Sequence, residues 1–452
     1  MALKIAVIGG GPAGYPAAQT AARLGAEVTL IEQAQLGGVC LHCGCIPSKS
    51  LLDAAHRLDI ARDIVRFVEA EVAPLPAVSW NKIQQRQQAV TRKLAAGVAA
   101  LMRQANVTVL SGTASFSDAH TLTVQTAQGT QTVAFDKAII ATGSQAFIPA
   151  PFDQLSGCLY DNSTIFQLPV LPAKLIIVGG GAIGCEMATF MAALGVEVHL
   201  IEMQARLLPA MDEGLARVAT KSLQKRGVHL LTGFAVTQAS IKEGQAVLTL
   251  SDGSTLTTPA VLAAIGRRCD LTDLHPEKVN LTWNRKGLQG VDAHTLQVAD
   301  HIYAAGDVTG LCLLAHAGTR QGIVAAQNAC GQTATYHNAL IPNAVYTSPE
   351  LACVGISKEQ ARAQGIEIKL HKSYLLANGR AQTMDETEGY VELISHAENG
   401  KLLGANIAGA HASELISTIT VALEAGLTVA QLQQVVFPHP TLSETIGEAL
   451  HK

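Results

Sequence analysis

The sequence predicts an α/β protein with two similar strand–helix–strand units and a third, C-terminal domain that mixes strands and helices. Residues 4–32 and 174–202 share one pattern: an apolar strand, a glycine turn, an Ala-rich helix, a second strand and a final glutamate. The second copy starts 170 residues after the first, and the two copies align without an insertion or deletion. The 452 residues are enough for about three domains of ~150 residues each.

The composition indicates a folded α/β enzyme. Hydrophobic residues make up 48% of the chain and charged residues 15%, which excludes a disordered protein. Forty glycines predict many tight turns and close backbone approaches, which fit an α/β enzyme better than a β-sandwich. The net charge of −4 gives no basic surplus, so no nucleic-acid partner is expected.

The apolar segments do not predict a membrane protein. No continuous apolar run reaches the ~18 residues of a membrane span. The run at the N-terminus stops at glycines after the length of a strand, which is not the pattern of a signal peptide. A cytoplasmic location is therefore expected, although a mitochondrial matrix protein whose leader had been removed would show the same features.

Each repeat carries a glycine pattern that is typical of a dinucleotide-binding turn. The first glycine makes the tight turn, the second lets the backbone approach a pyrophosphate, and the third lets the helix pack on the strand. The phosphates are then expected at the helix N-terminus, where free N–H groups and the helix dipole attract anions. The glycines are Gly9, Gly11 and Gly14 in the first copy and Gly179, Gly181 and Gly184 in the second.

The glutamate that ends each repeat strengthens this interpretation. Glu32 and Glu202 each lie 23 residues after the first glycine of their copy, where a carboxylate accepts hydrogen bonds from ribose hydroxyls. Glu202 would repel a 2′-phosphate and so favours NAD over NADP. A glycine-rich turn that binds nothing is the alternative, but the pattern occurs twice between a strand and a helix. Two dinucleotide sites on one chain imply a flavin and a nicotinamide.

The remaining elements follow in the order of an α/β fold. Residues 51–70 and 85–104 are expected to be helical, and residues 107–143 to form short strands with turns. Apolar strands are expected over 137–143, 260–266 and 302–307. The last ends in Asp307, whose carboxylate suits a ribityl hydroxyl but equally a helix N-cap.

These elements predict three domains. The first is discontinuous and binds the flavin, the second interrupts it and binds the nicotinamide nucleotide, and the third starts near Pro342. The expected boundaries are 1–143 with 267–338, then 144–266, then 339–452.

Three of the nine cysteines crowd into one short segment, as Cys40, Cys43 and Cys45. A structural zinc site needs about four ligands, and no second pair of matching form follows Cys40 and Cys43, so no metal is expected. Inert thiols would not need to lie so close together. A redox disulfide is the third interpretation, with one sulfur exposed to substrate and the other facing an electron source.

The segment around these cysteines carries a specific resemblance. Its pattern GGxCxxxGCIPSK, with the rest of the chain, resembles the FAD-dependent pyridine nucleotide–disulfide oxidoreductases. The resemblance implies that Cys40 and Cys45 form the redox disulfide, with Cys40 meeting substrate and Cys45 facing the flavin. It also implies that Lys49 lies beside the flavin with Glu186 as its partner. Cys43 departs from the pattern, and we expect it to be a small buried thiol.

The same resemblance assigns cofactor contacts along the chain. For FAD it adds three flavin-contact segments and one adenine-contact position. For NAD it adds a loop on the nicotinamide side and one further residue. The residues are Thr142, Gly143, Asp307, Leu314, Ala315, His316, Lys49 and Ala114 for FAD, and Gly266 and Val236 for NAD.

A histidine near the C-terminus is the candidate general base. Thiol–disulfide exchange needs a thiolate, so a base must take the proton of the substrate thiol, and histidine titrates near neutrality. His439 and Glu444 are five residues apart, which a turn and a helix start could bring together. The resemblance implies that they form a catalytic dyad that completes the active site of the partner subunit, and hence a homodimer with shared sites.

Comparison within the family favours the branch that oxidises dihydrolipoyl groups. Glutathione-type reductases have Lys where this chain has Ser48, and the chain has no cysteine after Cys353 to form a C-terminal redox pair. The expected reaction passes electrons from a protein-bound dihydrolipoyl group through the disulfide and FAD to NAD⁺. The expected partner is the lipoyl domain of a 2-oxo acid dehydrogenase or related multienzyme complex. The alternatives are an NAD(P)H-dependent reductase of another small disulfide and a non-catalytic flavoprotein docking subunit.

Overall fold

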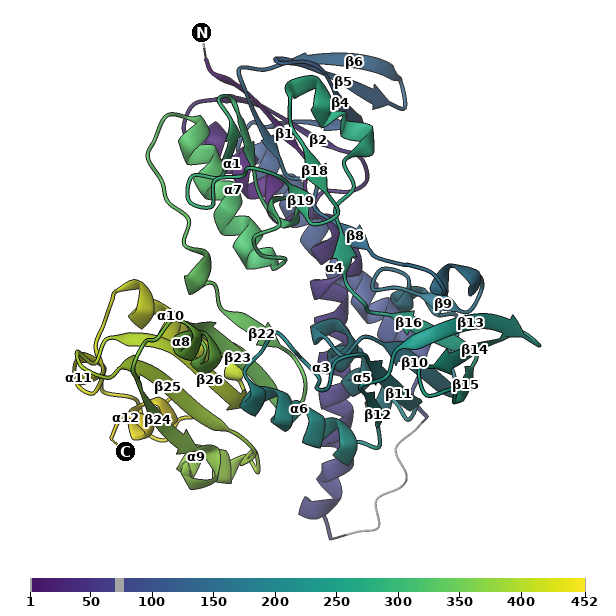
Figure 1. The fold of residues 1–452 in the computed structure, drawn as a ribbon, viewed down its shortest axis with the longest axis vertical. Coiled ribbons are helices and arrows are strands. Elements are labelled where there is room, and N and C mark those ends of the chain that lie inside the picture. The colour runs from purple at the N-terminus through teal and green to yellow at the C-terminus, as the bar shows by residue number, and fades with distance from the viewer. Residues whose placement is uncertain (1, 70–76, 452) are drawn as a thin grey trace. The chain divides into compact units, whose positions relative to one another are not determined.

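The computed structural model describes residues 2–69 and 77–451. The chain folds into two compact units and passes between them more than once (Figure 1). The first unit comprises Met1–Ser50, Asn81–Phe147 and Gly266–Asn338, and the second comprises Leu51–Trp80, Ile148–Ile265 and Ala339–Lys452. The division into two units does not test the boundaries of the three expected domains, which stay a prediction. Residues 1 and 452, at the outer ends of these domains, lie outside the described residues.

The first unit contains a six-stranded sheet. Its strands are β1 (Lys4–Ile8), β2 (Glu27–Glu32), β3 (Thr108–Ser111), β7 (Lys137–Ile140), β20 (Gln297–Ala299) and β21 (Ile302–Ala304). The order is β20-β21-β7-β1-β2-β3, and all neighbours are parallel except β20 and β21. A parallel sheet is covered on both faces, so its strands are continuously apolar. The carboxyl ends of β1, β7 and β21 are adjacent, and this edge positions the first nucleotide-binding turn.

Helices α1 (Gly14–Arg23) and α7 (Ala315–Ala329) pack closely in this unit because small residues face each other. A Cβ on Gly322 would lie 2.1 Å from the backbone oxygen of Ala13. An antiparallel sheet of β4 (Thr113–Asp118), β5 (Thr121–Thr126) and β6 (Gly129–Ala134) shares the core with β1 and β7. The expected short strands over 107–143 are therefore confirmed.

Three helices carry and follow the cysteine segment: α2 (Gly38–Cys43), α3 (Cys45–Asp63) and α4 (Trp80–Gln104). The helix expected over 51–70 begins six residues earlier, because Pro47 is tolerated in the first turn of a helix. It gives way to a 3₁₀ turn over Ile64–Phe67, and residue 70 lies outside the described residues. In the part of the chain that the structure describes, no helix is long and apolar enough to cross a membrane.

The second unit repeats the parallel sheet. Its strands are β9 (Leu159–Tyr160), β10 (Lys174–Val178), β11 (Glu197–Glu202), β12 (His229–Thr232) and β16 (Ala260–Ala263), in the order β12-β11-β10-β16-β9. Helices α5 (Ala182–Ala193) and α6 (Glu213–Lys225) follow β10 and β11. An antiparallel sheet of β13 (Val236–Lys242), β14 (Gln245–Leu250) and β15 (Thr255–Thr258) shares its core.

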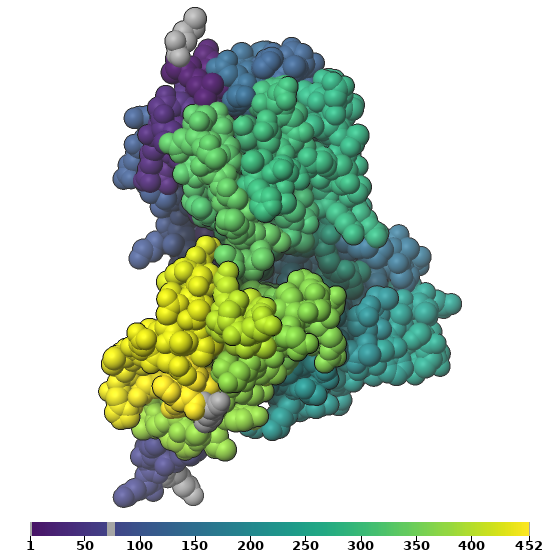
Figure 2. All heavy atoms as spheres, turned by 60° about the vertical axis from the view of Figure 1, so that its left-hand side comes forward, coloured from purple at the N-terminus to yellow at the C-terminus, as the bar shows by residue number. Residues whose placement is uncertain are grey.

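The C-terminal part of the second unit is an antiparallel sheet with helices. Its order is β22-β23-β26-β25-β24. Helices α10 and α12 contribute buried apolar residues to its core, and the last part of the chain lies at the surface (yellow in Figure 2). The elements are β22 (Asn343–Val345), β23 (Glu350–Gly355), α8 (Lys358–Ala363), β24 (Ile368–Tyr374), α9 (Gly379–Thr383), β25 (Tyr390–His396), β26 (Leu402–Gly409), α10 (Ala412–Glu424), α11 (Val429–Leu432) and α12 (Glu444–Leu450).

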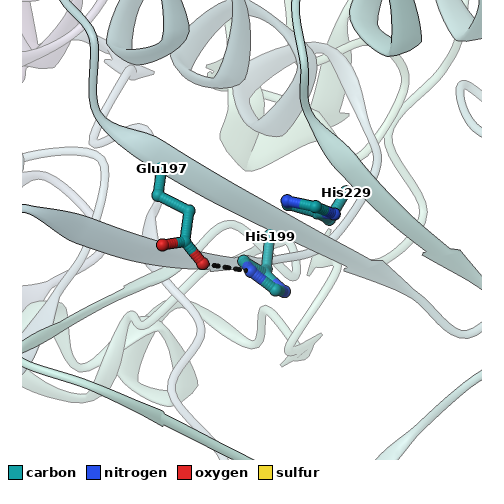
Figure 3. A group of neighbouring side chains, drawn as sticks. All are labelled: Glu197, His199 and His229. Carbon is teal, nitrogen blue, oxygen red and sulfur yellow. Dashed lines mark hydrogen bonds and ion pairs between the residues drawn. The ribbon is translucent and has the colours of Figure 1, made fainter.

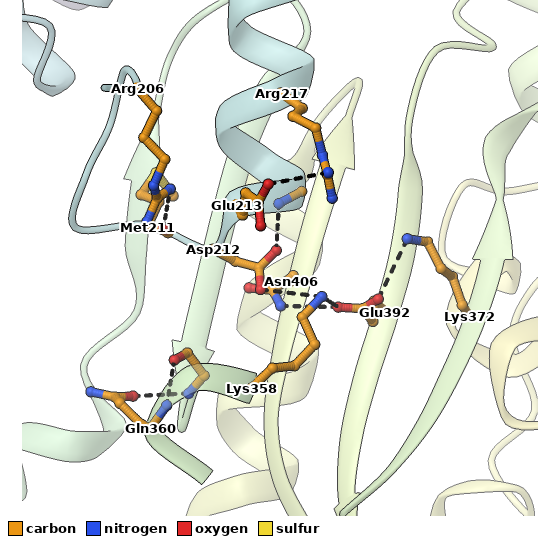
Figure 4. A network of polar contacts seen from close by, with 12 residues as sticks. Arg206, Met211, Asp212, Glu213, Arg217, Lys358, Gln360, Lys372, Glu392 and Asn406 are labelled. Atoms are coloured by element: carbon orange, nitrogen blue, oxygen red, sulfur yellow. Dashed lines mark hydrogen bonds and ion pairs between the residues drawn. The ribbon is translucent and has the colours of Figure 1, made fainter. Parts of the chain in front are cut away.

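A buried charge network joins helix α6 to the C-terminal sheet (Figure 4). Asp212 caps α6 through Oδ1, which accepts from Gly214 N–H at 2.7 Å, and its Oδ2 lies 3.2 Å from Lys358 Nζ. Lys358 also donates to Glu392 Oε1 at 2.7 Å, and Lys372 lies 3.4 Å from the other oxygen. Asp212 and Glu392 are both buried, so each needs this pairing to keep its charge.

Candidate active site

The first glycine turn lies between β1 and α1, and its geometry requires glycine. Gly9 has φ +103°, and a Cβ there would lie 2.3 Å from the backbone oxygen of Ala141. A Cβ on Gly14 would lie 1.7 Å from the backbone oxygen of Gly9, so the helix packs directly on the turn. At Gly11 a Cβ would meet Gly38 at an ordinary 3.8 Å. The first and third glycines are therefore fixed by packing within the protein itself.

Glu32 ends β2 and turns back onto this glycine turn. Its Oε2 accepts from Gly10 N–H at 2.6 Å, and its Oε1 accepts from Ala34 N–H at 2.7 Å. Each carboxylate oxygen has further acceptor capacity, which suits ribose hydroxyls. The carboxylate is thus positioned by the backbone before any ligand arrives.

Residues at the ends of β7 and β21 meet beside the turn. Ser144 donates to Asp307 Oδ2 at 2.5 Å, and Arg267 Nε donates to Ser144 Oγ at 2.7 Å. Thr142 is exposed and Gly143 is half-buried with φ +72°. Ser144 was not among the residues predicted from the sequence. The position of Ser144 directly after Thr142 and Gly143, at the carboxyl edge of the sheet, was the available signal.

Further predicted FAD contacts surround this edge, and they fit a dinucleotide. Leu314 precedes α7, and Ala315 and His316 form its first turn. The N-cap residues of α1 and α7, Ala13 and Leu314, make no side-chain cap, so no capping side chain occupies the positions where these helix starts would attract phosphate oxygens. Ala114 is buried on β4 in the core of the unit. The residues present therefore match what FAD needs: a glycine cradle, a ribose carboxylate, a ribityl carboxylate and open helix N-termini.

The cysteine segment brings two thiols and a lysine together. Cys40 lies on α2 and Cys45 begins α3, with Gly44 between the helices. A Cβ on Gly44 would lie 2.9 Å from the backbone oxygen of Val39, so only glycine allows this tight break. Lys49 is one turn after Cys45 on α3, and its positive charge acts on the Cys40 thiol.

Cys40 and Cys45 form a hydrogen-bonded pair of thiols in this structure. The bond to Cys45, together with burial, raises the pKa of the Cys40 thiol well above its ordinary value, and the charge of Lys49 lowers that pKa by a smaller amount. Cys43 is half-buried rather than buried as expected, because it ends the short helix α2.

The second glycine turn, between β10 and α5, repeats the first. A Cβ on Gly179 would lie 2.3 Å from the backbone oxygen of Ala264, and one on Gly184 would lie 1.9 Å from that of Gly179. A Cβ on Gly181 would meet nothing within 4 Å. Glu202 is buried and accepts from Gly180 N–H and Gln204 N–H, both at 2.7 Å.

Two residues expected to contact NAD, and the expected partner of Lys49, belong to different units of the structure. Val236 begins β13 in the second unit and is half-buried. Gly266 belongs to the first unit, where its backbone oxygen accepts from Phe147 N–H. Glu186 is buried on α5, and its Oε1 accepts from Tyr346 N–H at 3.0 Å. Because Lys49 belongs to the first unit and Glu186 to the second, their partnership stays a prediction.

The structure brings His439 and Glu444 together across a turn. His439 Nδ1 lies 2.9 Å from Glu444 Oε1, and Glu444 Oε2 accepts from Thr441 N–H at 2.8 Å. The Thr441 amide, and then His439, lower the pKa of Glu444, which therefore stays ionised at neutral pH. The His439 side chain is 79% exposed, so its second ring nitrogen faces solvent in this chain.

Comparison with protein-family models covers nearly the whole chain. The model of the pyridine nucleotide-disulphide oxidoreductases matches residues 3–332, and that of their dimerisation domain matches residues 341–450. The chain therefore belongs to the pyridine nucleotide-disulphide oxidoreductase family, and it is an FAD- and NAD-dependent oxidoreductase with the family's dimerisation domain.

Individual relatives match over their full length. The chain is 37% identical over 451 residues to a dihydrolipoyl dehydrogenase of Bacillus subtilis, covering 99% of this chain and 98% of the relative. It is 35% identical over 447 residues to that of Geobacillus stearothermophilus, covering 98% and 94%. Among solved structures, LpdA of Mycobacterium tuberculosis has a TM-score of 0.92 at 28% identity, covering 99% of both chains. The flavoprotein disulfide reductase RclA of Escherichia coli reaches 0.86 at 29%, covering 99% and 98%.

Proposed function

We propose that the chain is a dihydrolipoyl dehydrogenase, which oxidises protein-bound dihydrolipoyl groups and reduces NAD⁺. The observation that carries this proposal is the Cys40–Cys45 pair, placed by α2 and α3 beside the first glycine turn with Lys49 one turn further on. Full-length relatives that are named dihydrolipoyl dehydrogenases support the substrate.

The oxidised enzyme carries a Cys40–Cys45 disulfide in this mechanism. A substrate thiolate attacks Cys40 Sγ, the disulfide breaks, and Cys45 leaves as a thiolate. The second substrate thiol attacks the mixed disulfide, which releases Cys40 and closes the lipoyl disulfide. Glu32 and Asp307 would hold FAD in the first unit, where the flavin would supply the hydride chemistry that connects the cysteine pair to NAD⁺. The net products are the lipoyl disulfide, NADH and one proton.

A histidine from the partner subunit accepts the proton of the substrate thiol. Glu444 fixes the His439 ring at Nδ1, which leaves Nε2 to take the proton of the substrate thiol. Because the pKa of Cys40 is raised, this sulfur takes up a proton when it is released as a thiolate, and the protonated His439 can return that proton. The exposure of His439 in the single chain suits a residue that completes the site of a second copy. We therefore include a homodimer with two shared active sites in the proposal.

The cofactor contacts predicted from the sequence are part of the same proposal. Glu32, Asp307 and the α7 N-terminus hold FAD, with Thr142, Gly143 and Ala114 beside it. Glu202, Val236 and Gly266 hold NAD. We place the enzyme in the cytoplasm, with the lipoyl domain of a 2-oxo acid dehydrogenase or related complex as its partner.

Steady-state turnover of the FAD-containing enzyme tests the proposed substrate and acceptor. We expect efficient reduction of NAD⁺ by dihydrolipoamide, and turnover at least about tenfold lower with NADP⁺, because Glu202 repels the 2′-phosphate. Preference for glutathione disulfide over lipoamide in the reverse direction would contradict the proposal.

Two variants test the cysteine and histidine roles. Cys45→Ser should lower turnover at least about 10³-fold because no disulfide can form, whereas Cys43→Ser is the matched control and should stay near the wild-type rate. His439→Gln should lower turnover by about 10²–10⁴-fold. Full turnover in Cys45→Ser would contradict the mechanism. An unchanged rate in His439→Gln would show that His439 is not the general base.

A reductase of another disulfide is the second candidate. The similarity to the E. coli disulfide reductase favours it, with a TM-score of 0.86. The same panel separates the two candidates, because such a reductase would oxidise NADH with its own disulfide faster than with lipoamide.

A further inference from the structure

Two histidines and a glutamate form a cluster at the amino end of the second unit's parallel sheet (Figure 3). His199 on β11 is in register with His229 on β12, and Glu197 lies two residues before His199. In-register residues of parallel strands, and residues two apart on one strand, project from the same face. The three side chains therefore meet because of the strand pairing.

The donor atoms of this cluster lie within reach of one small ion. One ligand atom from each residue lies within 4.8 Å of those of the other two. His199 Nε2 lies 2.8 Å from Glu197 Oε1. Glu197 and His229 are exposed and His199 is half-buried, so an ion can enter from solvent and keep water in its remaining positions.

We propose that Glu197, His199 and His229 form a binding site for a divalent transition-metal ion, with Zn²⁺ as the reference ion. Two imidazoles and a carboxylate suit Zn²⁺ or Cu²⁺ and disfavour Mg²⁺, which prefers oxygen ligands and octahedral geometry. This site departs from the expectation of no metal, which rested on cysteine spacing. Its ligands are about 30 residues apart in sequence, and only the pairing of β11 with β12 joins them.

Two features of the cluster oppose binding of the ion: the orientation of the histidine rings and a neighbouring lysine. The imidazole rings of His199 and His229 are stacked, with centroids 4.4 Å apart and planes at 27°, so one ring must turn to aim its nitrogen at a shared ion. His229 is the exposed ring and can turn. Lys174 Nζ lies 3.3 Å from Glu197 Oε1 and competes with a cation for that carboxylate.

The position of the cluster separates it from the nucleotide site. Glu197 begins β11 and Glu202 ends it, and the second glycine turn lies at the carboxyl ends of the strands. A bound ion would instead link the edge strand β12 to β11. Because an ion that binds only the folded state stabilises it, the thermal midpoint should rise with ion concentration.

Calorimetric titration of the oxidised FAD-containing dimer with Zn²⁺, and separately with Cu²⁺ and Mg²⁺, tests the site. His199→Gln and His229→Gln should each weaken Zn²⁺ binding at least about tenfold, since loss of even an outer partner of a metal site costs that much. The matched control is His120→Gln with His301→Gln, a second pair of neighbouring rings, with centroids 4.5 Å apart and planes tilted by 32°. One nitrogen of each of these rings lies within hydrogen-bonding distance of a backbone oxygen. This control should retain both the affinity and the thermal shift.

Lys174→Gln provides the opposite test, because removal of the competing ammonium should tighten Zn²⁺ binding several-fold. Equal Zn²⁺ affinity in the wild type and in both single histidine variants would overturn the site. An unchanged affinity in Lys174→Gln would overturn Glu197 as a ligand. Turnover of the ion-free variants should match the wild type, because none of these residues belongs to the proposed catalytic or nucleotide-binding machinery.

Discussion

The two glycine turns of the chain have nearly the same geometry and lead into different structures. Gly9 and Gly179 have φ of +103° and +107°, and a Cβ on either would lie 2.3 Å from a carbonyl oxygen of the neighbouring strand's end. Glu32 and Glu202 each accept one N–H of the turn and one N–H two residues further on. The glycine turn and its glutamate therefore form one structural motif that occurs twice in the chain.

The segment that follows the glutamate makes the difference. Gly37 N–H donates to the Gly10 oxygen and Leu208 N–H to the Gly180 oxygen, both at 2.8 Å. In the first copy Gly38 comes next, and a Cβ there would lie 2.7 Å from the Cα of the turn's second glycine. This contact sets the cysteine helix α2 directly on the turn. In the second copy Leu208 is buried in its own unit. The repeat thus supplies two nucleotide sites, and one loop decides which of them carries redox chemistry.

The largest effect is expected from the third glycine of each turn. Gly14→Ala and Gly184→Ala would each place a methyl group less than 2 Å from a backbone oxygen, with a cost of about 3 kcal/mol or more. If the turns serve different cofactors, Gly14→Ala loses FAD, whereas Gly184→Ala keeps FAD and loses NAD⁺ affinity. Flavin absorbance after gel filtration and an NAD⁺ titration measure the two outcomes.

Gly97→Ala is the control for these variants, because a Cβ in that helix meets nothing within 4 Å. It should be neutral or slightly stabilising. Loss of FAD in both turn variants would show that the two turns are not independent.

An intermediate effect is expected from the glycines that distinguish the copies. Gly38→Ala combines φ +59° with a 2.7 Å backbone contact and should cost about 2 kcal/mol while displacing α2, so turnover falls with stability. Gly181→Ala meets open space and should leave the thermal midpoint within a degree or two while weakening NAD⁺ binding. Thermal unfolding measures the expected loss of stability in Gly38→Ala, and KM for NAD⁺ measures the expected loss of affinity in Gly181→Ala. A stable, fully active Gly38→Ala would contradict the docking of α2 on the turn.

The smallest effect is expected from the paired glutamates. In Glu32→Gln or Glu202→Gln the new amide NH₂ must face one of the two N–H groups that donate to this side chain, and the loss of that hydrogen bond costs about 1 kcal/mol. We expect Glu32→Gln to lose FAD more easily, and Glu202→Gln to raise KM for NAD⁺ several-fold and to narrow the preference over NADP⁺. Exposed Glu213→Gln is the control. An unchanged nucleotide preference in Glu202→Gln would separate this carboxylate from ribose recognition.

Local patterns predicted much of the fold and the candidate site. The glycine spacing and the apolar strands located both turns, because their chemistry is contained within about 30 consecutive residues. Helix starts were less predictable: α3 begins at Cys45 rather than at residue 51, since Pro47 fits a first turn as well as a loop. The dyad of His439 and Glu444 was predicted because one turn spans it.

Contacts between segments that are distant in the sequence could not be predicted from local patterns. Ser144 and Arg267 hold Asp307, yet they come from segments more than 100 residues apart. Ser144 meets Asp307 because β7 and β21 are neighbours, and it meets Arg267 because β8 (Gln145–Ala146) pairs with β17 (Arg267–Arg268). The same holds for His199 and His229, which only the strand register brings side by side. The half-buried position of Cys43 depends on how α2 ends at Gly44.

The sequence by itself determined where backbone must pass close to backbone and which side chains carry chemistry, because glycines, cysteines and terminal glutamates act through short-range sterics and reactivity. Only the tertiary structure decided which of these residues share a site. Strand order and register set those distances, and they depend on the packing of apolar faces from remote parts of the chain. That packing places the cysteine pair on one glycine turn and leaves the other turn without it.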